Sequence, residues 1–268
     1  MSNSQNRATV PPPSIINTLL ELRAGSEYVS GLTSYAAIDY LPRGDGHPVM
    51  VVPGFMANEI STQRLRTFLR VMGYDTFDWR QGRNVGRLGP SENTLLARIR
   101  MIHERLGKKP SVVGWSLGGV YARILAKNHP HDIRSVITLG SPLVHPQRSA
   151  IDHIYRRTTQ QPPQQHPEQL AGINAAPAVP ATSIYSRLDG IVNWRACLSE
   201  ESPTSENIRV FGSHCGLGFQ ALVLAIVADR LAQHHSAYEV LRFQRPVLKR
   251  KDSGTVTTTP AAFNVLDN

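Results

Sequence analysis

The sequence predicts an α/β protein with a mostly parallel central sheet that has helices on both faces. Short apolar runs bounded by glycine and proline alternate along the chain with stretches whose apolar residues recur at helical spacing. Strict alternation of this kind indicates right-handed crossovers and a single sheet. The chain has 268 residues, of which 41% are hydrophobic and 18% charged, so it is long and apolar enough for one large buried core.

The individual elements follow from breakers and periodicity. Ser14 is the expected N-cap of a short leading helix, and the four apolar residues between Pro48 and Pro53 predict a strand buried on both faces. Further strands are expected at 74–79, 112–113, 133–139, 182–185 and 208–211, and helices at 61–72, 91–106, 120–128 and 219–231.

Composition and periodicity divide the chain into three parts. Residues 1–45 form an N-terminal segment with the short helix, residues 46–232 the α/β domain, and residues 233–268 a basic tail that we expect to be disordered. Within the domain, residues 143–180 are rich in proline and glutamine and show little periodicity. Because they are much longer than an ordinary connection, we expect a lid-like insertion there.

The net charge of +9 requires that nucleic acid and anionic membranes be considered as partners. The sequence has no zinc-finger spacing, no RNP pattern and no basic region leading into heptads, so we expect no specific nucleic-acid partner. Solvated helix faces and the basic tail explain the charge, and weak electrostatic contact of the tail with a membrane surface is the alternative. The N-terminus lacks the apolar core of a secretory signal, which predicts a cytoplasmic protein.

The most informative motif is the run GWSLG at 114–118, which lies between a predicted strand and a predicted helix. A serine in this G-x-S-x-G context is held in a strained turn at the carboxyl edge of the sheet, where it can act as a nucleophile. Ser116 is therefore the candidate nucleophile, and the amide of Leu117 at the helix N-terminus is a candidate oxyanion donor. The alternative is a chance match in a glycine-rich turn.

Two further residues support the catalytic interpretation by their order in the chain. Asp189 follows the predicted strand at 182–185, and His214 follows the one at 208–211. Both therefore lie at carboxyl ends of strands, in the order serine, acid, histidine that this architecture uses. An ordinary Asp-Gly turn and a packing or capping histidine are the structural alternatives.

The second oxyanion donor is expected in the loop after the first strand. Gly54 permits a sharp turn there, and the amide of Phe55 is the candidate donor, with that of Met56 as the alternative. Met56 and Trp115 are also candidate substrate-binding residues, because they flank the serine with apolar surface. Trp115 and Leu117 could instead simply pack against the sheet and helix.

These motifs resemble the α/β-hydrolase superfamily and, within it, bacterial lipases and esterases. The resemblance covers about residues 46–232 and is carried by the runs VVPGF at 51–55, GWSLGG at 114–119, DGIV at 189–192 and GSH at 212–214. It implies an α/β-hydrolase fold with Ser116 as nucleophile, His214 as general base and Asp189 as its orienting acid. Many members have His-Gly where this chain has Pro53-Gly54, and the Pro-Gly-aromatic form resembles cutinase-like and some lipase sequences.

The chain has only two cysteines, Cys197 and Cys215, and both lie close to the candidate triad in sequence. A disulfide between the acid and histidine loops would close a loop of about 17 residues and add about 3 kcal/mol at most. The absence of a recognisable signal peptide argues for free thiols instead. The residues alone leave this choice open.

The function expected from the sequence is hydrolysis of a small-molecule or lipid carboxylic ester through an acyl-enzyme on Ser116. No histidine shows metal-ligand spacing, so we expect neither a metal ion nor another cofactor. One alternative is an acyltransferase that uses the same triad to acylate an alcohol, amine or thiol. Another is a non-catalytic binding protein that retains the fold, although all members of the candidate triad are present here.

Overall fold

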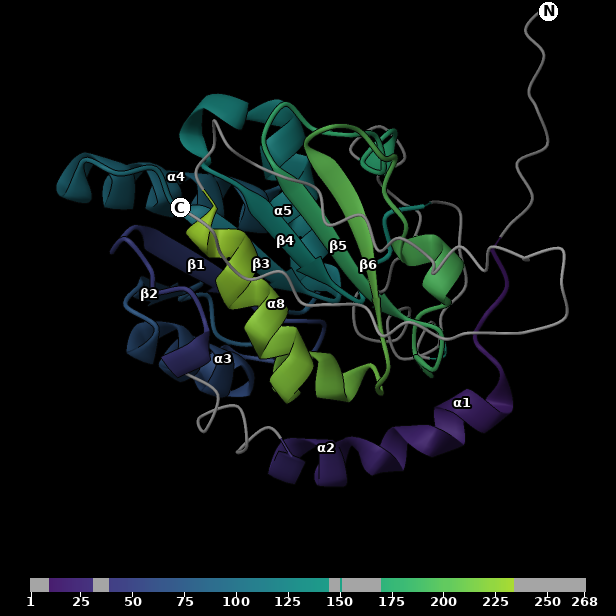
Figure 1. Cartoon of the computed structure of the whole chain (residues 1–268). Helices are drawn as coiled ribbons and strands as arrows, with labels where there is room; N and C mark the ends of the chain where they lie inside the picture. The colour runs from purple at the N-terminus through teal and green to yellow at the C-terminus, as the bar shows by residue number, and fades with distance from the viewer. Residues whose placement is uncertain (1–9, 31–38, 145–149, 151–169, 234–268) are drawn as a thin grey trace, which may run out of the picture.

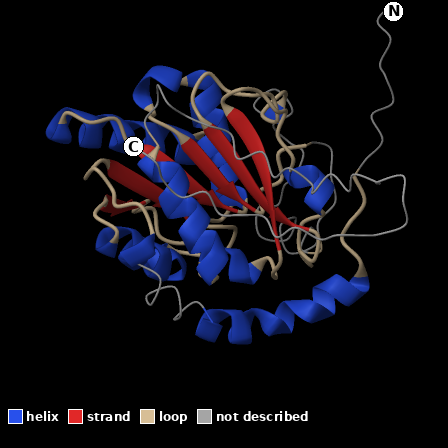
Figure 2. Cartoon of the chain, viewed as in Figure 1, coloured by secondary structure: helices blue, strands red, loops and turns tan. Residues whose placement is uncertain are grey.

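The computed structural model describes residues 10–30, 39–144, 150 and 170–233, and in this part six strands form one sheet (Figures 1 and 2). Its order is β2-β1-β3-β4-β5-β6, and every neighbouring pair is parallel. The strands are β1 (Pro48–Val52), β2 (Asp75–Asp78), β3 (Ser111–Trp115), β4 (Val136–Leu139), β5 (Ala181–Ser186) and β6 (Ser205–Val210). The predicted fold class is confirmed.

Helices cover both faces of the sheet, and α8 crosses its front in Figure 1 while α4 and α5 lie behind it. The α-helices are α1 (Ile15–Leu19), α2 (Ala24–Ser30), α3 (Gln63–Val71), α4 (Pro90–Leu106), α5 (Leu117–Asn128) and α8 (Ala221–Ala232). The shorter 3-10 helices are η1 (Leu20–Arg23), η3 (Glu59–Thr62), η4 (Pro130–Asp132), η5 (Trp194–Cys197) and η6 (Cys215–Gly218). Among the described residues, no helix combines the length and the apolar character that crossing a membrane requires.

The core lies on the two faces of the sheet, because the side chains of each strand alternate between them. Met50 and Val52 of β1 pack on the side of α4 and α5. Val49 and Val51, which alternate with them, pack on the side of α3 and α8. All five residues of β1 are buried, which explains why the strand reads as a continuous apolar run.

The order in which the chain adds strands to the sheet reverses at β1, although all the strands remain parallel. From β1 the chain moves outward to β2, and β3 then pairs with the other side of β1. At such a switch point the loops that follow the two strands diverge and leave a crevice at the carboxyl edge. The loop that begins at Pro53 follows β1 and the turn at Ser116 follows β3, so both lie at this switch point.

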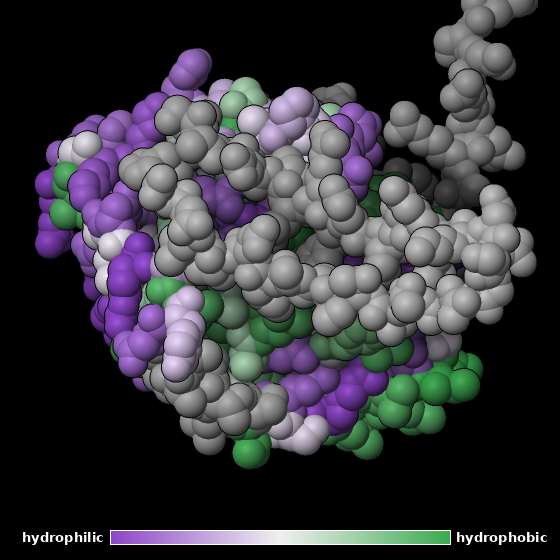
Figure 3. Space-filling view, viewed as in Figure 1, coloured by the Kyte–Doolittle hydropathy of each residue, from purple (hydrophilic) through white to green (hydrophobic). Residues whose placement is uncertain are grey.

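The N-terminal segment forms α1, η1 and α2 in direct succession, and Figure 1 shows it along the lower edge of the molecule. Ser14 is its N-cap, as predicted, because its Oγ accepts a hydrogen bond from the amide of Asn17 at 3.2 Å. Large apolar side chains project outward from it, including Ile15 (80% exposed) and Leu22 (89% exposed). Figure 3 shows this apolar surface in green at the lower right.

The predicted lid-like insertion at 143–180 lies mostly outside the described residues, since 145–149 and 151–169 are not described. Its described ends belong to the core, because Leu143, Leu170 and Ile173 are buried there. The buried guanidinium of Arg123 donates to the carbonyl oxygen of Ile173 at 2.9 Å and so fixes the second of these ends. The basic tail from 234 onward also lies outside the described residues.

Candidate active site

Ser116 occupies the strained turn that its motif predicts. It joins β3 to α5 with φ 53° and ψ −122°, a left-handed conformation that non-glycine residues rarely adopt. A Cβ at Gly114 would collide with the backbone of Gly118, and one at Gly118 would collide with the carbonyl oxygen of Val52. The amide of Ser116 donates to the carbonyl oxygen of Leu139 at 2.8 Å, which secures the turn against β4.

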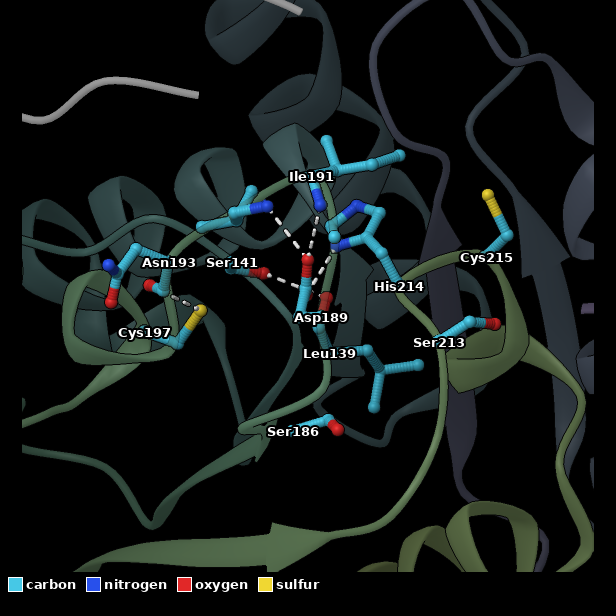
Figure 4. Close-up of polar contacts among 12 residues, drawn as sticks. Leu139, Ser141, Ser186, Asp189, Ile191, Asn193, Cys197, Ser213, His214 and Cys215 are labelled. Atoms are coloured by element: carbon cyan, nitrogen blue, oxygen red, sulfur yellow. Dashed lines mark hydrogen bonds and ion pairs between the residues drawn. The ribbon is translucent and has the colours of Figure 1, made fainter. Parts of the chain in front are cut away.

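Asp189 and His214 form a direct hydrogen-bonded pair, shown in Figure 4. Nδ1 of His214 lies 2.6 Å from Oδ2 of Asp189, and both side chains are almost fully buried. The other carboxylate oxygen accepts hydrogen bonds from the amides of Ile191 at 2.9 Å and Val192 at 2.7 Å. One carboxylate oxygen is thus held by its own loop and the other faces the imidazole, so Nε2 of His214 is the nitrogen left to accept a proton.

The electrostatic surroundings of His214 favour its protonated form. Burial by itself lowers the pKa of His214, but the charge of Asp189 and its hydrogen bond raise it, and the charge of Glu21 adds to them. The balance leaves the pKa of His214 above the ordinary value of 6.5. A histidine with a raised pKa is a stronger base once it is neutral, which is the property a general base needs.

The end of β4 connects the serine turn to the acid–base pair. The carbonyl oxygen of Leu139 accepts a hydrogen bond from the amide of Ser116. The next residue, Gly140, lies directly against the Asp189–His214 pair. A Cβ built on Gly140 would lie 3.0 Å from Nδ1 of His214 and 3.1 Å from Oδ2 of Asp189. Within the described residues Asp189 and His214 are hydrogen-bonded, whereas Ser116 and His214 are not. Such bonds are often long before substrate binds.

The loop after β1 lies beside the candidate nucleophile. A Cβ on Gly54 would lie 3.1 Å from Cβ of Ser116 and 3.8 Å from its Oγ. The amide of Met56 donates to the carbonyl oxygen of Asn84 at 2.7 Å, so this amide is engaged elsewhere and is disfavoured as an oxyanion donor. Phe55 and Leu117 remain the predicted donors, and Leu117 is the first residue of α5, where amides have no partner within the helix.

Trp115 is hydrogen-bonded to the loop that carries His214. Its Nε1 donates to the carbonyl oxygen of His214 at 3.1 Å, and its ring meets that of Phe219 edge-on at 6.4 Å. With Tyr28, Ile60 and other residues it also lines a cavity of about 660 Å³. Trp115 therefore has a clear packing role, and a substrate-binding role for it or for the partly exposed Met56 stays a prediction.

Asn84 and Gly140 were not singled out by the sequence. Asn84 is fully buried, and its side chain donates to the carbonyl oxygen of Pro53 at 2.9 Å. Its backbone amide donates to the carbonyl oxygen of Ala57 at 2.8 Å, so this one residue holds the loop after β1 at both ends. Asn84 stands in a polar loop without a recognisable motif, and only the folded structure brings it to this place.

The two cysteines are both free thiols in this structure. Figure 4 shows them on opposite sides of the Asp189–His214 pair, with Cys197 directed toward the carbonyl oxygen of Asn193. Burial, the nearby charge of Glu21 and a hydrogen bond with it raise the pKa of Cys215 to about 12. This thiol is therefore protonated near neutral pH, which disfavours it as a nucleophile. Within the described ranges no group of His, Cys, Asp or Glu residues is arranged to hold a metal ion.

Comparison with known proteins agrees with this architecture. A family model described as the alpha/beta hydrolase fold matches residues 68–196, which include Ser116 and Asp189. No curated protein sequence matches the chain.

Several solved structures are similar to this one. Aspergillus fumigatus lipase B has a TM-score of 0.55 at 17% identity, and the match covers 70% of this chain but only 53% of that lipase. A structure from the metagenome-derived lipolytic enzymes LipS and LipT has a TM-score of 0.55 at 16% identity, with 72% of this chain and 96% of that chain covered. Bacillus licheniformis lipase BlEst2 has a TM-score of 0.54 at 15% identity, and the match covers 72% of this chain and 94% of that lipase. The parallel sheet, the family match and these structures together show that the chain is an α/β-hydrolase-fold protein, similar in structure to lipases and esterases.

Proposed function

We propose that the protein is a serine hydrolase that cleaves carboxylic esters through an acyl-enzyme on Ser116. The single observation that carries the proposal is the buried Asp189–His214 pair, at 2.6 Å, on the same sheet edge as a serine held in a strained turn. Strain of this kind is maintained only where the surrounding structure enforces it, and it is typical of active sites. The similarity to lipases and esterases supports the same reaction class.

The reaction begins with attack of Ser116 Oγ on the ester carbonyl carbon, while Nε2 of His214 takes the hydroxyl proton. Asp189 stabilises the imidazolium, and the amides of Leu117 and Phe55 donate to the oxyanion of the tetrahedral intermediate. When the intermediate collapses, the C–O bond to the alcohol breaks and His214 returns the proton to the leaving oxygen. Water then attacks the acyl-enzyme by the same route and releases the acid and free Ser116.

The expected substrate is an uncharged ester with an apolar acyl group, either a small molecule or a lipid. Gly54 lies against Ser116, and the neighbouring side chains of Phe55, Met56 and Leu117 are apolar. An apolar surface next to the scissile carbonyl binds alkyl or aryl groups better than charged ones.

Initial rates on p-nitrophenyl esters from acetate to palmitate test this function in the wild type and in Ser116→Ala. We expect hydrolysis that disappears in Ser116→Ala and persists in the control Ser91→Ala, which changes a serine at the start of α4. Labelling of Ser116 by a fluorophosphonate gives a readout that does not depend on the choice of ester. Wild-type protein that neither hydrolyses any ester nor takes the label would contradict the proposal. Labelling with ester transfer to an added alcohol, in place of hydrolysis, would favour the acyltransferase alternative.

A further inference from the structure

The N-terminal helical segment attaches to the sheet edge in an unusual way. An amphipathic surface helix normally buries its apolar face. Here Ile15, Leu19 and Leu22 are 80%, 66% and 89% exposed, while the polar residues between them turn toward the domain. The segment is therefore held to the domain largely by hydrogen bonds, and these bonds converge on the loops that carry Asp189 and His214.

Glu21 makes the central contacts. Its Oε1 accepts hydrogen bonds from the amides of Gly190 and His214, both at 2.8 Å. Its Oε2 accepts one from the amide of Cys215 at 3.0 Å. A single carboxylate thus connects the residue after the candidate acid to the backbone of the candidate base. Hydrogen bonds to an ionised acceptor are shorter and stronger than neutral ones, so this link is a firm one.

Glu27 and Arg23 extend the same link on either side. Glu27 accepts hydrogen bonds from the amide of Ser213, at 2.9 Å to Oε1, and from its hydroxyl group. Arg23 pairs with Glu27 at 3.1 Å and donates to the carbonyl oxygen of Leu188 at 2.8 Å. The residues before Asp189 and before His214 are therefore both bound to the same helical segment.

Glycines in the two loops make this close approach possible. A Cβ at Gly190 would collide with the backbone of Asn17, and a Cβ at Gly216 would collide with the carboxylate of Glu27. In addition, Thr18 Oγ1 donates to the carbonyl oxygen of Gly190 at 2.8 Å. At these positions the backbone of the two loops lies in direct contact with the helical segment. A loosely attached N-terminal extension would not need such close packing.

We propose that Glu21 is a positioning residue for the His214 base, and that the segment from Ile15 to Ser30 acts as a clamp that holds the acid and base loops in register. The proposal rests on the proposed function, because it assigns Glu21 to the same triad. Glu21 acts by binding the backbone amide of His214 and through the negative charge of its own carboxylate. The hydrogen bonds described above join it to backbone amides and not to the atoms that react.

The clamp has an electrostatic consequence as well as a geometric one. The acidic groups that contact His214 are Asp189 from the loop after β5 and Glu21 from the N-terminal segment. Glu27, paired to Arg23, contacts the preceding residue, Ser213. Cys215 is adjacent in the histidine loop and is protonated near neutral pH. After Asp189, the charge of Glu21 is the next contribution that raises the pKa of His214. Loss of the Glu21 charge should therefore lower this pKa.

The variant Glu21→Gln, with Glu104→Gln on the exposed side of α4 as a matched control, tests the clamp. Glutamine keeps the shape but removes the charge, and its amide N–H cannot accept a hydrogen bond. We expect kcat/KM on a soluble ester to fall about 10- to 100-fold, mainly through kcat, because misplacement of a catalytic group by about 1 Å has effects of this size. We also expect the acid limb of the pH profile to move to lower pH, whereas a purely structural role would leave it in place. The control should match wild type in both measurements.

The pKa of His214, measured by NMR titration, separates the clamp from the proposed function because it needs no turnover. A lowered pKa in Glu21→Gln supports the electrostatic part even if no ester is cleaved. An active wild type with an unchanged rate and unchanged pKa in folded Glu21→Gln would overturn the proposal and leave the hydrolase function intact. Should Glu21→Gln fail to fold, Glu21→Asp keeps the charge but retracts it from the three amides. It should lose rate and keep its acid limb, and wild-type activity there would overturn the clamp.

Discussion

The carboxylate of Glu21 accepts a hydrogen bond from the backbone amide of His214 at 2.8 Å, although 193 positions separate the two residues in the chain. The N-terminal helical segment is thereby joined to the loop that carries the candidate base. The same carboxylate binds the amide next to the candidate acid, Asp189. The carboxyl edge of the sheet is consequently built from both ends of the described chain.

The acid–base pair leads to a prediction about pH. Burial lowers the pKa of His214, but the charge of Asp189, its hydrogen bond and the charge of Glu21 together raise this pKa above 6.5. Catalysis needs the neutral imidazole, so kcat/KM should fall as the pH drops through this raised pKa, with the midpoint above 6.5. Initial rates from pH 5 to 9 at low substrate concentration measure the midpoint. An acid limb centred below pH 6 would contradict the electrostatic environment described here.

Replacement of His214 by alanine should reduce kcat at least about 10³-fold, and the double variant with Ser116→Ala should be no worse than either single one. The reason is that nucleophile and base act as one unit, so removing the second group costs nothing further. Single-turnover kinetics on an activated ester measure all three rates. Effects that multiply in the double variant would show that the two residues act independently.

Gly140→Ala should damage the site through a single methyl group. Its Cβ would lie 3.0 Å from Nδ1 of His214 and 3.1 Å from Oδ2 of Asp189, so the hydrogen-bonded pair must shift. Gly107→Ala is the control, since Gly107 also has a positive φ, 65°, but has open space around its Cβ position. Both variants should lose about 1 kcal/mol of unfolding free energy from backbone strain. Only Gly140→Ala should lose activity, and equal activity in the two would refute the steric argument.

Asn84→Ala should disturb the loop beside Ser116. The side chain of Asn84 is fully buried and donates to the carbonyl oxygen of Pro53, which the variant leaves without that partner. We expect the unfolding free energy to fall by about 1–3 kcal/mol. We also expect kcat to fall more than KM rises, since the loop carries the predicted donor Phe55. Urea unfolding and steady-state kinetics test both effects, with exposed Asn93→Ala as the control. An unchanged kcat would show that the position of this loop does not affect the catalytic step.

A second buried histidine, at the opposite edge of the sheet, should make the fold sensitive to acid. His47 is fully buried, with Nδ1 2.5 Å from Asp45 and Nε2 3.0 Å from the hydroxyl of Ser111. Burial lowers the pKa of His47 below 6.5, so the unfolded chain binds a proton more readily than the folded one. The contribution of His47 to stability is therefore fully present above about pH 6.5 and is lost as the pH falls below it. The raised pKa of His214 contributes with the opposite sign.

Urea unfolding at pH 7 and at pH 5 measures this loss. In His47→Gln the part of the pH dependence that comes from His47 should disappear, although the variant should be less stable at both values. Activity at pH 8 should remain, because His47 lies before the amino end of β1, away from Ser116. A difference in stability between pH 5 and pH 7 that is the same in wild type and in His47→Gln would contradict the assignment.

Much of the site could be predicted from the sequence because its signals are local. The run GWSLG contains the glycines that the turn at Ser116 requires, and Asp189 and His214 each stand directly after a predicted strand. The element boundaries were also close, although α5 begins at Leu117 and not at 120, since the turn at Ser116 leads directly into the helix. The choice between a disulfide and free thiols was open in the sequence and depended on where the two loops placed their cysteines.

By itself, then, the sequence determined the α/β class, the order of strands and helices along the chain, and the candidate triad of Ser116, Asp189 and His214. These features depend on periodicity, turn chemistry and chain order, which operate over a few residues. Only the tertiary structure decided that Glu21, Asn84 and Gly140 support the site. Their contacts join segments that are distant in sequence, and a polar or small residue gives no local sign of the partner that packing will bring to it.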